Sequence, residues 1–231
     1  MFRSLLMLSF VVIISCGVPK HIRNDFSILY DSINFKVDTI LKINGYYTIP
    51  KQYFSPRFEK PNFRGKYTTA LDTFYLNYIF FEDGLYARNF SPNIPDTVIK
   101  YLKEIAHDTN TTGLLKRSFY QGPYWGIYRI DGDTLITQSI NNPCTPKVWV
   151  ATEERFFILK NNSILQFSTK VLGKYPKYDM EIWAQEEKDK KYNPAIFIPV
   201  TILPESNSWL KKEKWFWKDE AEYLKWQSKK K

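Results

Sequence analysis

The sequence YWGIYRIDGDTLIT occupies residues 124–137 and contains two runs of aromatic and β-branched residues around a short polar centre. That centre is Asp131-Gly132-Asp133. An Asp-Gly pair between two such runs favours a tight β-hairpin, because these residues tolerate the positive φ that the turn requires. We therefore predict two antiparallel strands, one ending near Ile130 and the other beginning at Thr134.

Two further segments follow the same pattern, with strand-forming runs on both sides of a turn sequence. They are residues 72–90 around Glu82-Asp83-Gly84 and residues 155–167 around Asn161-Asn162. Three hairpins in series predict an antiparallel meander. Clean alternation of apolar and polar residues is missing in several of these runs. This indicates that both faces of the sheet are partly buried, as in a closed or strongly curled sheet.

The remaining elements complete a single mainly β domain over residues 25–205. Residues 195–203 predict a final strand, which we expect at a sheet edge because Pro199 lacks an N–H group. The prolines between residues 50 and 63 predict an irregular aromatic loop. Residues 97–105 predict a short helix capped by Asp96. The expected fold is a meander curled into a barrel or half-barrel, with one or two short helices.

The composition agrees with a folded domain of this size. The chain has 231 residues and a formal net charge of +9, and 44% of its residues are hydrophobic. This balance is typical of a globular protein and excludes wholesale disorder. Its 2 cysteines exclude a disulfide-rich scaffold, and its 2 histidines leave little material for histidine-based metal or acid–base chemistry.

The first 15 residues have the pattern of a secretory signal peptide. Arg3 supplies a positive charge, and the chain from Leu5 to Ile14 is apolar except for Ser9. An apolar stretch of about ten residues is too short to span a bilayer, which requires about 20 residues in a helix. It fits the hydrophobic region of a signal peptide instead.

This stretch ends in Ile13-Ile14-Ser15-Cys16, which resembles the lipobox of bacterial lipoproteins. The resemblance implies cleavage between Ser15 and Cys16 and acylation of Cys16, which would anchor the chain in a lipid bilayer. We expect residues 16–24 to be the lipidated cysteine and a short tether. Cys16 is not followed by Asp or by an acidic run, and by the same resemblance this favours the inner leaflet of the outer membrane, facing the periplasm. The alternatives are an ordinary signal peptide with a chance cysteine and a buried N-terminal strand.

A second resemblance covers about residues 40–205, where several short motifs follow one another in order. They are Gly45-Tyr46-Tyr47 and residues 80–84, 125–134 and 155–158. This succession resembles the lipocalin-like β-meander lipoproteins of the Bacteroidota. The resemblance implies a lipocalin-like barrel and provides no catalytic residues to transfer. The candidate residues lining a ligand cavity in such a barrel are Phe74, Tyr78, Trp125 and Tyr128.

A search for catalytic and metal-binding motifs returns nothing specific. The sequence has no Gly-x-Ser-x-Gly, His-Glu-x-x-His, Cys-x-x-Cys or phosphate-binding glycine-rich loop. Asp131 and Asp133 are too few ligands for calcium, and a hairpin turn explains them better. Cys144 is interpreted as a small packed residue, because nothing brings it to His107, its one candidate partner outside the tether. We expect no catalytic residue, no cofactor and no metal.

The C-terminal segment, residues 206–231, combines lysines with aromatic residues. This combination suits an anionic membrane interface, and the candidate membrane contacts are Trp215, Trp217, Lys218 and Lys225. The alternative is that Trp215 and Trp217 pack on the sheet and that the lysines are solvated. Binding of nucleic acid is not expected, because a lipid-anchored envelope protein rarely meets it.

These observations lead to one functional hypothesis and two rivals. The first is a non-catalytic envelope lipoprotein that binds an apolar or amphipathic ligand or an envelope partner. The first rival is a structural or assembly-partner lipoprotein with no small-molecule ligand, which a filled barrel interior would favour. The second rival is an envelope hydrolase, which would require a pocket with convergent carboxylates of perturbed pKa.

Overall fold

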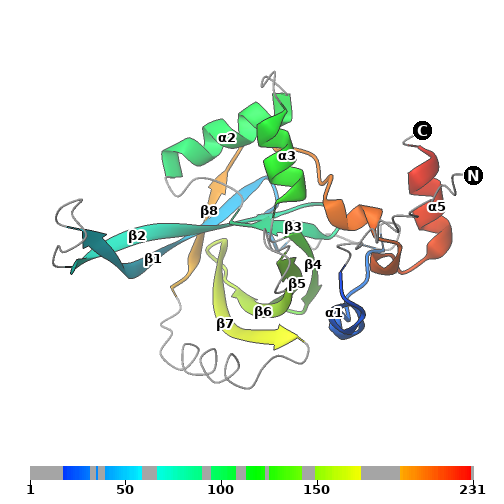
Figure 1. Ribbon diagram of the computed structural model, residues 1–231, viewed down its shortest axis with the longest axis horizontal. Helices are drawn as coiled ribbons and strands as arrows, with labels where there is room; N and C mark the ends of the chain where they lie inside the picture. The colour runs from blue at the N-terminus through cyan, green and yellow to red at the C-terminus, as the bar shows by residue number, and fades with distance from the viewer. Residues whose placement is uncertain are drawn as a thin grey trace, which may run out of the picture.

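The computed structural model describes residues 18–31, 35, 40–58, 67–89, 95–107, 113–122, 125–141, 149–172 and 193–229. Its centre is a closed barrel of eight strands that follow one another in chain order, and every neighbouring pair is antiparallel (Figure 1). The strands are β1 (Gly45–Phe58), β2 (Tyr67–Phe80), β3 (Leu85–Arg88), β4 (Trp125–Asp131), β5 (Thr134–Asn141), β6 (Val150–Ile158), β7 (Ser163–Leu172) and β8 (Ala195–Pro199). The predicted mainly β meander is therefore confirmed, and the barrel is closed.

The three predicted hairpins connect β2 to β3, β4 to β5 and β6 to β7. Each turn contains a residue in the left-handed region. These are Gly84 with φ 86°, Gly132 with φ 61° and Asn162 with φ 58°. Glycine and asparagine adopt this conformation more readily than other residues, and for this reason the turn sequences alone located the hairpins.

Strand β8 closes the barrel, so the prediction of an edge strand is wrong. It pairs with β1 between Gly45↔Pro199 and Thr48↔Ile196, and with β7 at Ser163↔Ile196 and Ile164↔Ala195. Pro199 is the last residue of the strand. At that position its missing N–H group removes no hydrogen bond from the middle of the sheet, so the proline does not prevent pairing on both sides.

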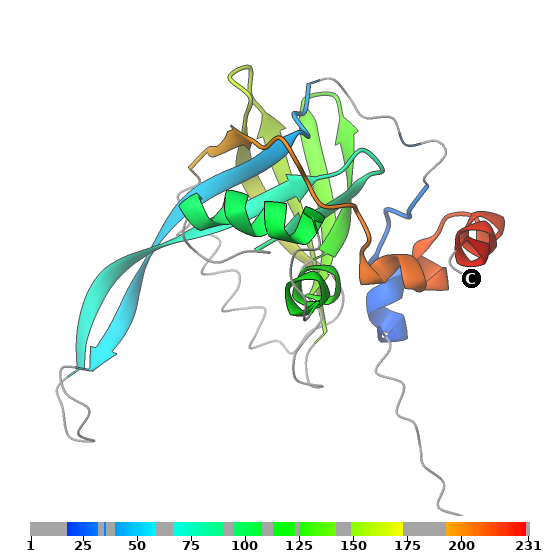
Figure 2. The same cartoon turned by 90° about the horizontal axis from the view of Figure 1, so that it is seen from above.

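Strands β1 and β2 continue beyond the barrel as a two-stranded ribbon (Figures 1 and 2). They pair as far as Phe58↔Tyr67, whereas β8 pairs with β1 only up to Thr48. The irregular loop predicted between residues 50 and 63 is therefore wrong for residues 50–58, which belong to β1. Pro50 and Pro56 lie where β8 no longer pairs with β1, and a strand with one unpaired edge accommodates proline.

Two helices between β3 and β4 cover part of the outer wall of the barrel (Figure 1). They are α2 (Pro95–His107), which contains the predicted helix, and α3 (Leu114–Gln121). The C-terminal segment forms the short 3-10 helices η1 (Trp209–Lys212) and η2 (Lys214–Phe216) and the helix α5 (Glu220–Ser228). The expected tether differs as well, because residues 20–25 form helix α1 (Lys20–Asp25).

Two apolar clusters occupy the two faces of the barrel wall. The inner cluster contains Tyr47, Ile49, Tyr78, Phe80, Tyr86, Tyr128, Leu135, Phe156 and Ile164. The outer cluster contains Tyr46, Ile79, Leu85, Ala87, Trp125, Ile127 and Ile140, together with residues of α1, α2, α3 and the C-terminal segment. Successive residues of a strand point to opposite faces. Burial of both faces therefore explains the missing alternation in the sequence.

Several predicted residues lie outside the described part of the chain. These are Ser15, Cys16 and Cys144, and the side chain of Phe74 also belongs to this group. The predicted cleavage, acylation and packed thiol therefore stay predictions.

Candidate functional site

Inside the barrel, a group of aromatic side chains pack against one another, and we call this group the aromatic layer. It consists of Tyr47, Tyr78, Phe80, Tyr86, Tyr128 and Phe156. Phe80 is at its centre, with ring centroids 5.1 Å from Tyr128, 5.7 Å from Tyr86 and 5.7 Å from Tyr47. Two predicted lining residues, Tyr78 and Tyr128, belong to this layer and are 1% and 0% exposed.

The chain before β1 packs against the same layer. The ring of Phe35 lies 5.1 Å from Tyr128, and Leu41 is buried in the inner cluster. The backbone N–H of Lys42 donates to the hydroxyl of Tyr47 at 3.1 Å. The described residues therefore cover the aromatic layer rather than leave it open as a cavity.

A second group, here called the polar layer, lies next to the aromatic layer inside the barrel. It consists of Arg88, Ser139, Thr152, Glu154 and Gln166. The guanidinium of Arg88 on β3 lies 2.9 Å from the Glu154 carboxylate and donates to Thr152 at 3.2 Å, both on β6. Since β3 and β6 are three strands apart in a barrel of eight, Arg88 spans the interior from one wall to the other.

The other polar residues complete this layer. The side-chain amide of Gln166 donates to Glu154 at 3.0 Å, and the hydroxyls of Ser139 and Thr152 are 3.0 Å apart. Buried polar groups are expensive unless they are paired, and these groups are paired with one another. The ion pair therefore occupies the interior and is held there by hydrogen bonds to Thr152 and Gln166.

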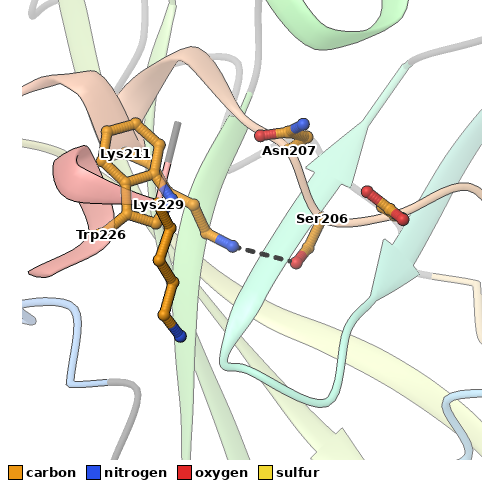
Figure 3. Close-up of a pocket in the computed structure, with 6 residues that line it drawn as sticks. Ser206, Asn207, Lys211, Trp226 and Lys229 are labelled. Atoms are coloured by element: carbon orange, nitrogen blue, oxygen red, sulfur yellow. Dashed lines mark hydrogen bonds between the residues drawn. The ribbon is translucent and has the colours of Figure 1, made fainter. Parts of the chain in front are cut away.

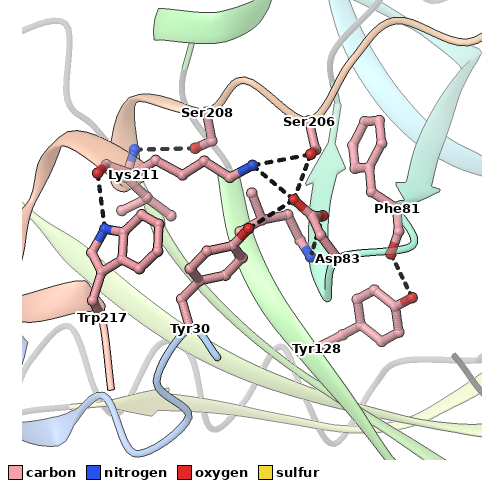
Figure 4. A network of polar contacts seen from close by, with 10 residues as sticks. Tyr30, Phe81, Asp83, Tyr128, Ser206, Ser208, Lys211 and Trp217 are labelled. Atoms are coloured by element: carbon pink, nitrogen blue, oxygen red, sulfur yellow. Dashed lines mark hydrogen bonds and ion pairs between the residues drawn. The ribbon is translucent and has the colours of Figure 1, made fainter. Parts of the chain in front are cut away.

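Burial determines the electrostatics of the aromatic layer. It raises the pKa of Tyr47 to about 12 and that of Tyr86 to about 12, and the nearby charge of Arg88 partly opposes the second shift. Burial also raises the pKa of Tyr128, whose hydroxyl donates to the carbonyl oxygen of Phe81 at 2.7 Å (Figure 4). These phenols are therefore neutral at pH 7 and pack as uncharged rings.

Trp125 does not share a lining with Tyr78 and Tyr128. It belongs to the outer cluster, where its indole N–H donates to the carbonyl oxygen of Phe119 on α3 at 2.7 Å. Trp125 and Tyr128 are three residues apart on β4, so they point to opposite faces of the wall. The spacing of the two residues is visible in the sequence and would have excluded a cavity lined by both Trp125 and Tyr128.

Asp83 in the β2–β3 turn binds residues from two distant segments, one before β1 and one after β8 (Figure 4). Its Oδ2 accepts from the hydroxyl of Tyr30 at 3.0 Å, from Ser206 at 2.5 Å and from the ammonium of Lys211 at 2.7 Å. Burial and the Asp83 carboxylate both raise the pKa of Tyr30. In the sequence Asp83 is recognisable only as a turn residue, because its partners are far away along the chain.

A surface pocket of about 320 Å³ lies beside this network (Figure 3). It is lined by Glu205, Ser206, Asn207, Lys211, Trp226 and Lys229. The ammonium of Lys211 is 3.2 Å from the hydroxyl of Ser206, a spacing that resembles a Ser–Lys catalytic pair. However, Ser206 donates to the Asp83 carboxylate and Lys211 is ion-paired with it. The geometry therefore places Ser206 and Lys211 in a network that binds the C-terminal segment to Asp83 of the β2–β3 turn.

The predicted membrane-contact residues have three different surroundings. Trp217 is 6% exposed, and its indole N–H donates to the carbonyl oxygen of Lys211 at 2.9 Å. Lys218 is ion-paired with Asp31 at 2.8 Å, which raises the pKa of Lys218. Trp215 is half-buried and Lys225 is exposed on α5, so both side chains are accessible from the surface. For Trp217 the alternative of packing on the folded domain fits the structure.

An exposed patch that was not predicted from the sequence lies on the outer wall of β4, β6 and β7, here called the arginine–phenylalanine face. It consists of Arg129, Arg155, Phe157 and Phe167. The two phenylalanines are 40% and 38% exposed and stack with ring centroids 4.1 Å apart. Arg129 and Arg155 lie on either side of Ile136 of β5 and are both paired with it in the sheet. A bulge between Arg155 and Phe156 brings Phe167 against Phe157, and such a bulge has no clear signal in the sequence.

Among the described residues, no group of three or more histidine, cysteine, aspartate or glutamate side chains could hold a metal ion. Of the described helices, none is both long enough and apolar enough to cross a bilayer. A comparison with protein-family models, with curated proteins and with solved structures found no match.

Proposed function

We propose that this chain is a non-catalytic, lipid-anchored envelope lipoprotein whose barrel is a solid scaffold for binding a protein partner. One observation carries the proposal: the Arg88–Glu154 pair spans the barrel interior next to a packed aromatic layer. A drug-sized or lipid-like ligand needs a cavity of about 300–1,000 Å³. To make that space, the barrel would have to break a buried ion pair, which costs about 3–5 kcal/mol.

The arginine–phenylalanine face is the surface that we assign to the partner. Protein interfaces are enriched in arginine and aromatic residues, and their energetic centres are rigid side chains. The side chain of Arg155 is 49% exposed and is held in place by Glu153 at 2.9 Å. Phe157 and Phe167 project from paired strands. A partner with an apolar residue flanked by carboxylates would complement this face.

The interior and the partner surface can be tested separately. For the interior, native mass spectrometry of the mature protein released from detergent should give the mass of the acylated chain alone. A reproducible additional mass that is lost on denaturation would overturn the solid scaffold and would identify the class of the ligand.

For the partner surface, a photo-crosslinking amino acid at Phe157 should give one discrete protein adduct in intact cells. Arg155→Glu should suppress the adduct, since it reverses the charge of the face. The matched control carries the same amino acid at Lys100, which is 79% exposed on α2. Equal adducts at both positions, or none at Phe157, would contradict the assignment.

The anchor is tested through the two cysteines. Cys16→Ser should abolish labelling with radioactive palmitate and leave the precursor uncleaved, because only Cys16 lies in the lipobox-like sequence. Cys144→Ser is the matched control and should be labelled and cleaved like the natural protein. A Cys16→Ser protein that is still labelled and processed would refute the anchor.

A further inference from the structure

The two ends of the described chain are bound to each other by what we call the terminal clasp, residues 26–30 with residues 215–218. Tyr30 and Trp217 form a parallel β-bridge. The N–H of Tyr30 donates to the carbonyl oxygen of Phe216 at 2.8 Å, and the N–H of Lys218 donates to the carbonyl oxygen of Tyr30 at 2.9 Å. The ring of Tyr30 stacks on Phe216 at 5.6 Å and meets Trp217 edge-on at 4.7 Å.

The packing extends from the clasp to the first described residue. Val18, Ile22 and Phe26 are 4%, 0% and 4% exposed and belong to the outer cluster. The ring of Phe26 meets Trp215 of η2 edge-on at 5.8 Å. Residues 18–24, which the sequence predicted as part of a tether, are therefore part of the folded domain.

This packing limits the distance between the domain and the proposed anchor. Only Gly17 separates Cys16 from Val18 in the sequence. Two residue steps span at most about 7 Å. The acyl chains of a lipidated Cys16 must enter the hydrocarbon region, and the headgroup region above it is only about 5–8 Å thick on each side of the bilayer. Val18 must then lie at the level of the lipid headgroups.

We propose that α1 and the η1–η2 segment rest directly on the headgroup surface, so that acylation fixes the orientation of the barrel as well as its location. The proposal rests on the acylation of Cys16 proposed above. The exposed Lys20 and Lys212 and the half-buried Trp215 supply basic and aromatic groups, which favour an anionic membrane interface. The β6–β7 turn is then directed away from the membrane, since it lies on the other side of the barrel from α1 (Figure 2).

The orientation can be measured with an environment-sensitive fluorophore on single cysteines. Cys144→Ser removes the other thiol, and Lys20→Cys or Lys160→Cys then carries the label on acylated full-length mature protein. Lys20 begins α1, and Lys160 lies in the β6–β7 turn. The protein is reconstituted in vesicles of phosphatidylethanolamine and phosphatidylglycerol with lipids that are spin-labelled at the headgroup. Quenching should be several-fold stronger at position 20 than at position 160.

A variant with a restored tether supplies the control. A flexible insertion of about 12 glycine and serine residues between Gly17 and Val18 adds about 20 Å of reach. It should leave flotation with the vesicles unchanged and reduce the quenching at position 20 to the level at position 160. Failure of the natural protein to float would refute the acylation itself. Normal flotation with equal quenching at both positions, or with none at position 20, would refute only the fixed orientation.

Discussion

The aromatic layer and the polar layer fill adjacent parts of one barrel and are built from the same strands. Strand β3 contributes Tyr86 to the first and Arg88 to the second, and β6 contributes Phe156 and Glu154 in the same way. The aromatic layer is stabilised by shape and by removal of apolar surface from water. The polar layer is stabilised only while each charge retains its partner.

This difference means that the two layers tolerate different changes. An aromatic layer loses stability in proportion to the volume that is removed, because the neighbouring rings relax only partly into the cavity. A paired polar layer is damaged most when one partner is removed, whereas removal of both partners leaves no uncompensated charge. Four measurements test this contrast, and they are arranged from the largest expected effect to the smallest.

Phe80→Ala should reduce the free energy of unfolding by about 4 kcal/mol, since large-to-small substitutions of buried phenylalanine cost about 3–5 kcal/mol. Phe80 contacts the rings of Tyr47, Tyr86 and Tyr128. Urea denaturation measures the change. Phe167→Ala, on the exposed outer wall, is the matched control and should cost less than about 1 kcal/mol. Equal losses for the two variants would show that the aromatic layer is not packed.

Glu154→Ala should cost about 3 kcal/mol, because it leaves the guanidinium of Arg88 inside the barrel without its carboxylate. Arg155→Ala is the matched control, because Arg155 is the 49% exposed partner of Glu153 on the outer wall. An ion pair at such a partly exposed site contributes about 0–1 kcal/mol. If urea denaturation gives the same loss for both variants, the polar layer does not depend on pairing.

The tyrosines of the aromatic layer predict alkaline sensitivity. Burial raises the pKa of Tyr86 to about 12, so the folded chain holds this proton above pH 10 while the unfolded chain releases it. The stabilising contribution is complete below pH 10 and falls by about 1.4 kcal/mol per pH unit as the pH rises toward 12. Tyr86→Phe should remove the part of the slope that Tyr86 contributes, whereas Tyr47 and Tyr128, whose pKa values burial also raises, keep theirs. Urea denaturation at pH 8 and at pH 11 measures the difference. Parallel pH profiles of the two proteins would contradict the prediction.

The double variant Arg88→Met with Glu154→Leu should remain within about 1 kcal/mol of the natural protein, because both charges are removed and apolar volume replaces them. The single variants Arg88→Met and Glu154→Leu complete a double-mutant cycle that isolates the energy of the pair. If the double variant is as unstable as Glu154→Ala, Arg88 and Glu154 stabilise the barrel by more than the neutralisation of each other's charge.

The hairpins and the helix were predictable because their signals are local. Asp131-Gly132 and Asp83-Gly84 specify turns within a few residues, and the apolar stripe of Val98, Leu102 and Ile105 specifies α2. The prolines of β1 and Pro199 misled the prediction for the same reason. A local rule about a missing N–H group does not reveal which edge of a strand is paired.

The candidate site was less predictable, because its partners meet only through the closed barrel. Arg88 and Glu154 lie on strands that are not neighbours, and Lys211 is separated from Asp83 by 128 residues. Tyr78 and Tyr128 were predicted to line a ligand cavity, and both belong to the buried inner cluster. No local pattern indicated that other rings pack around them.

The sequence by itself determined the meander, its turns and the short helix, because each depends on the conformational preferences of a few consecutive residues. Only the tertiary structure decided that β8 closes the sheet, that an ion pair spans the interior, and that the N-terminal residues pack against the C-terminal segment. These features join residues that are distant in the chain. Their free energy depends on burial and pairing in the folded molecule, which no local pattern records.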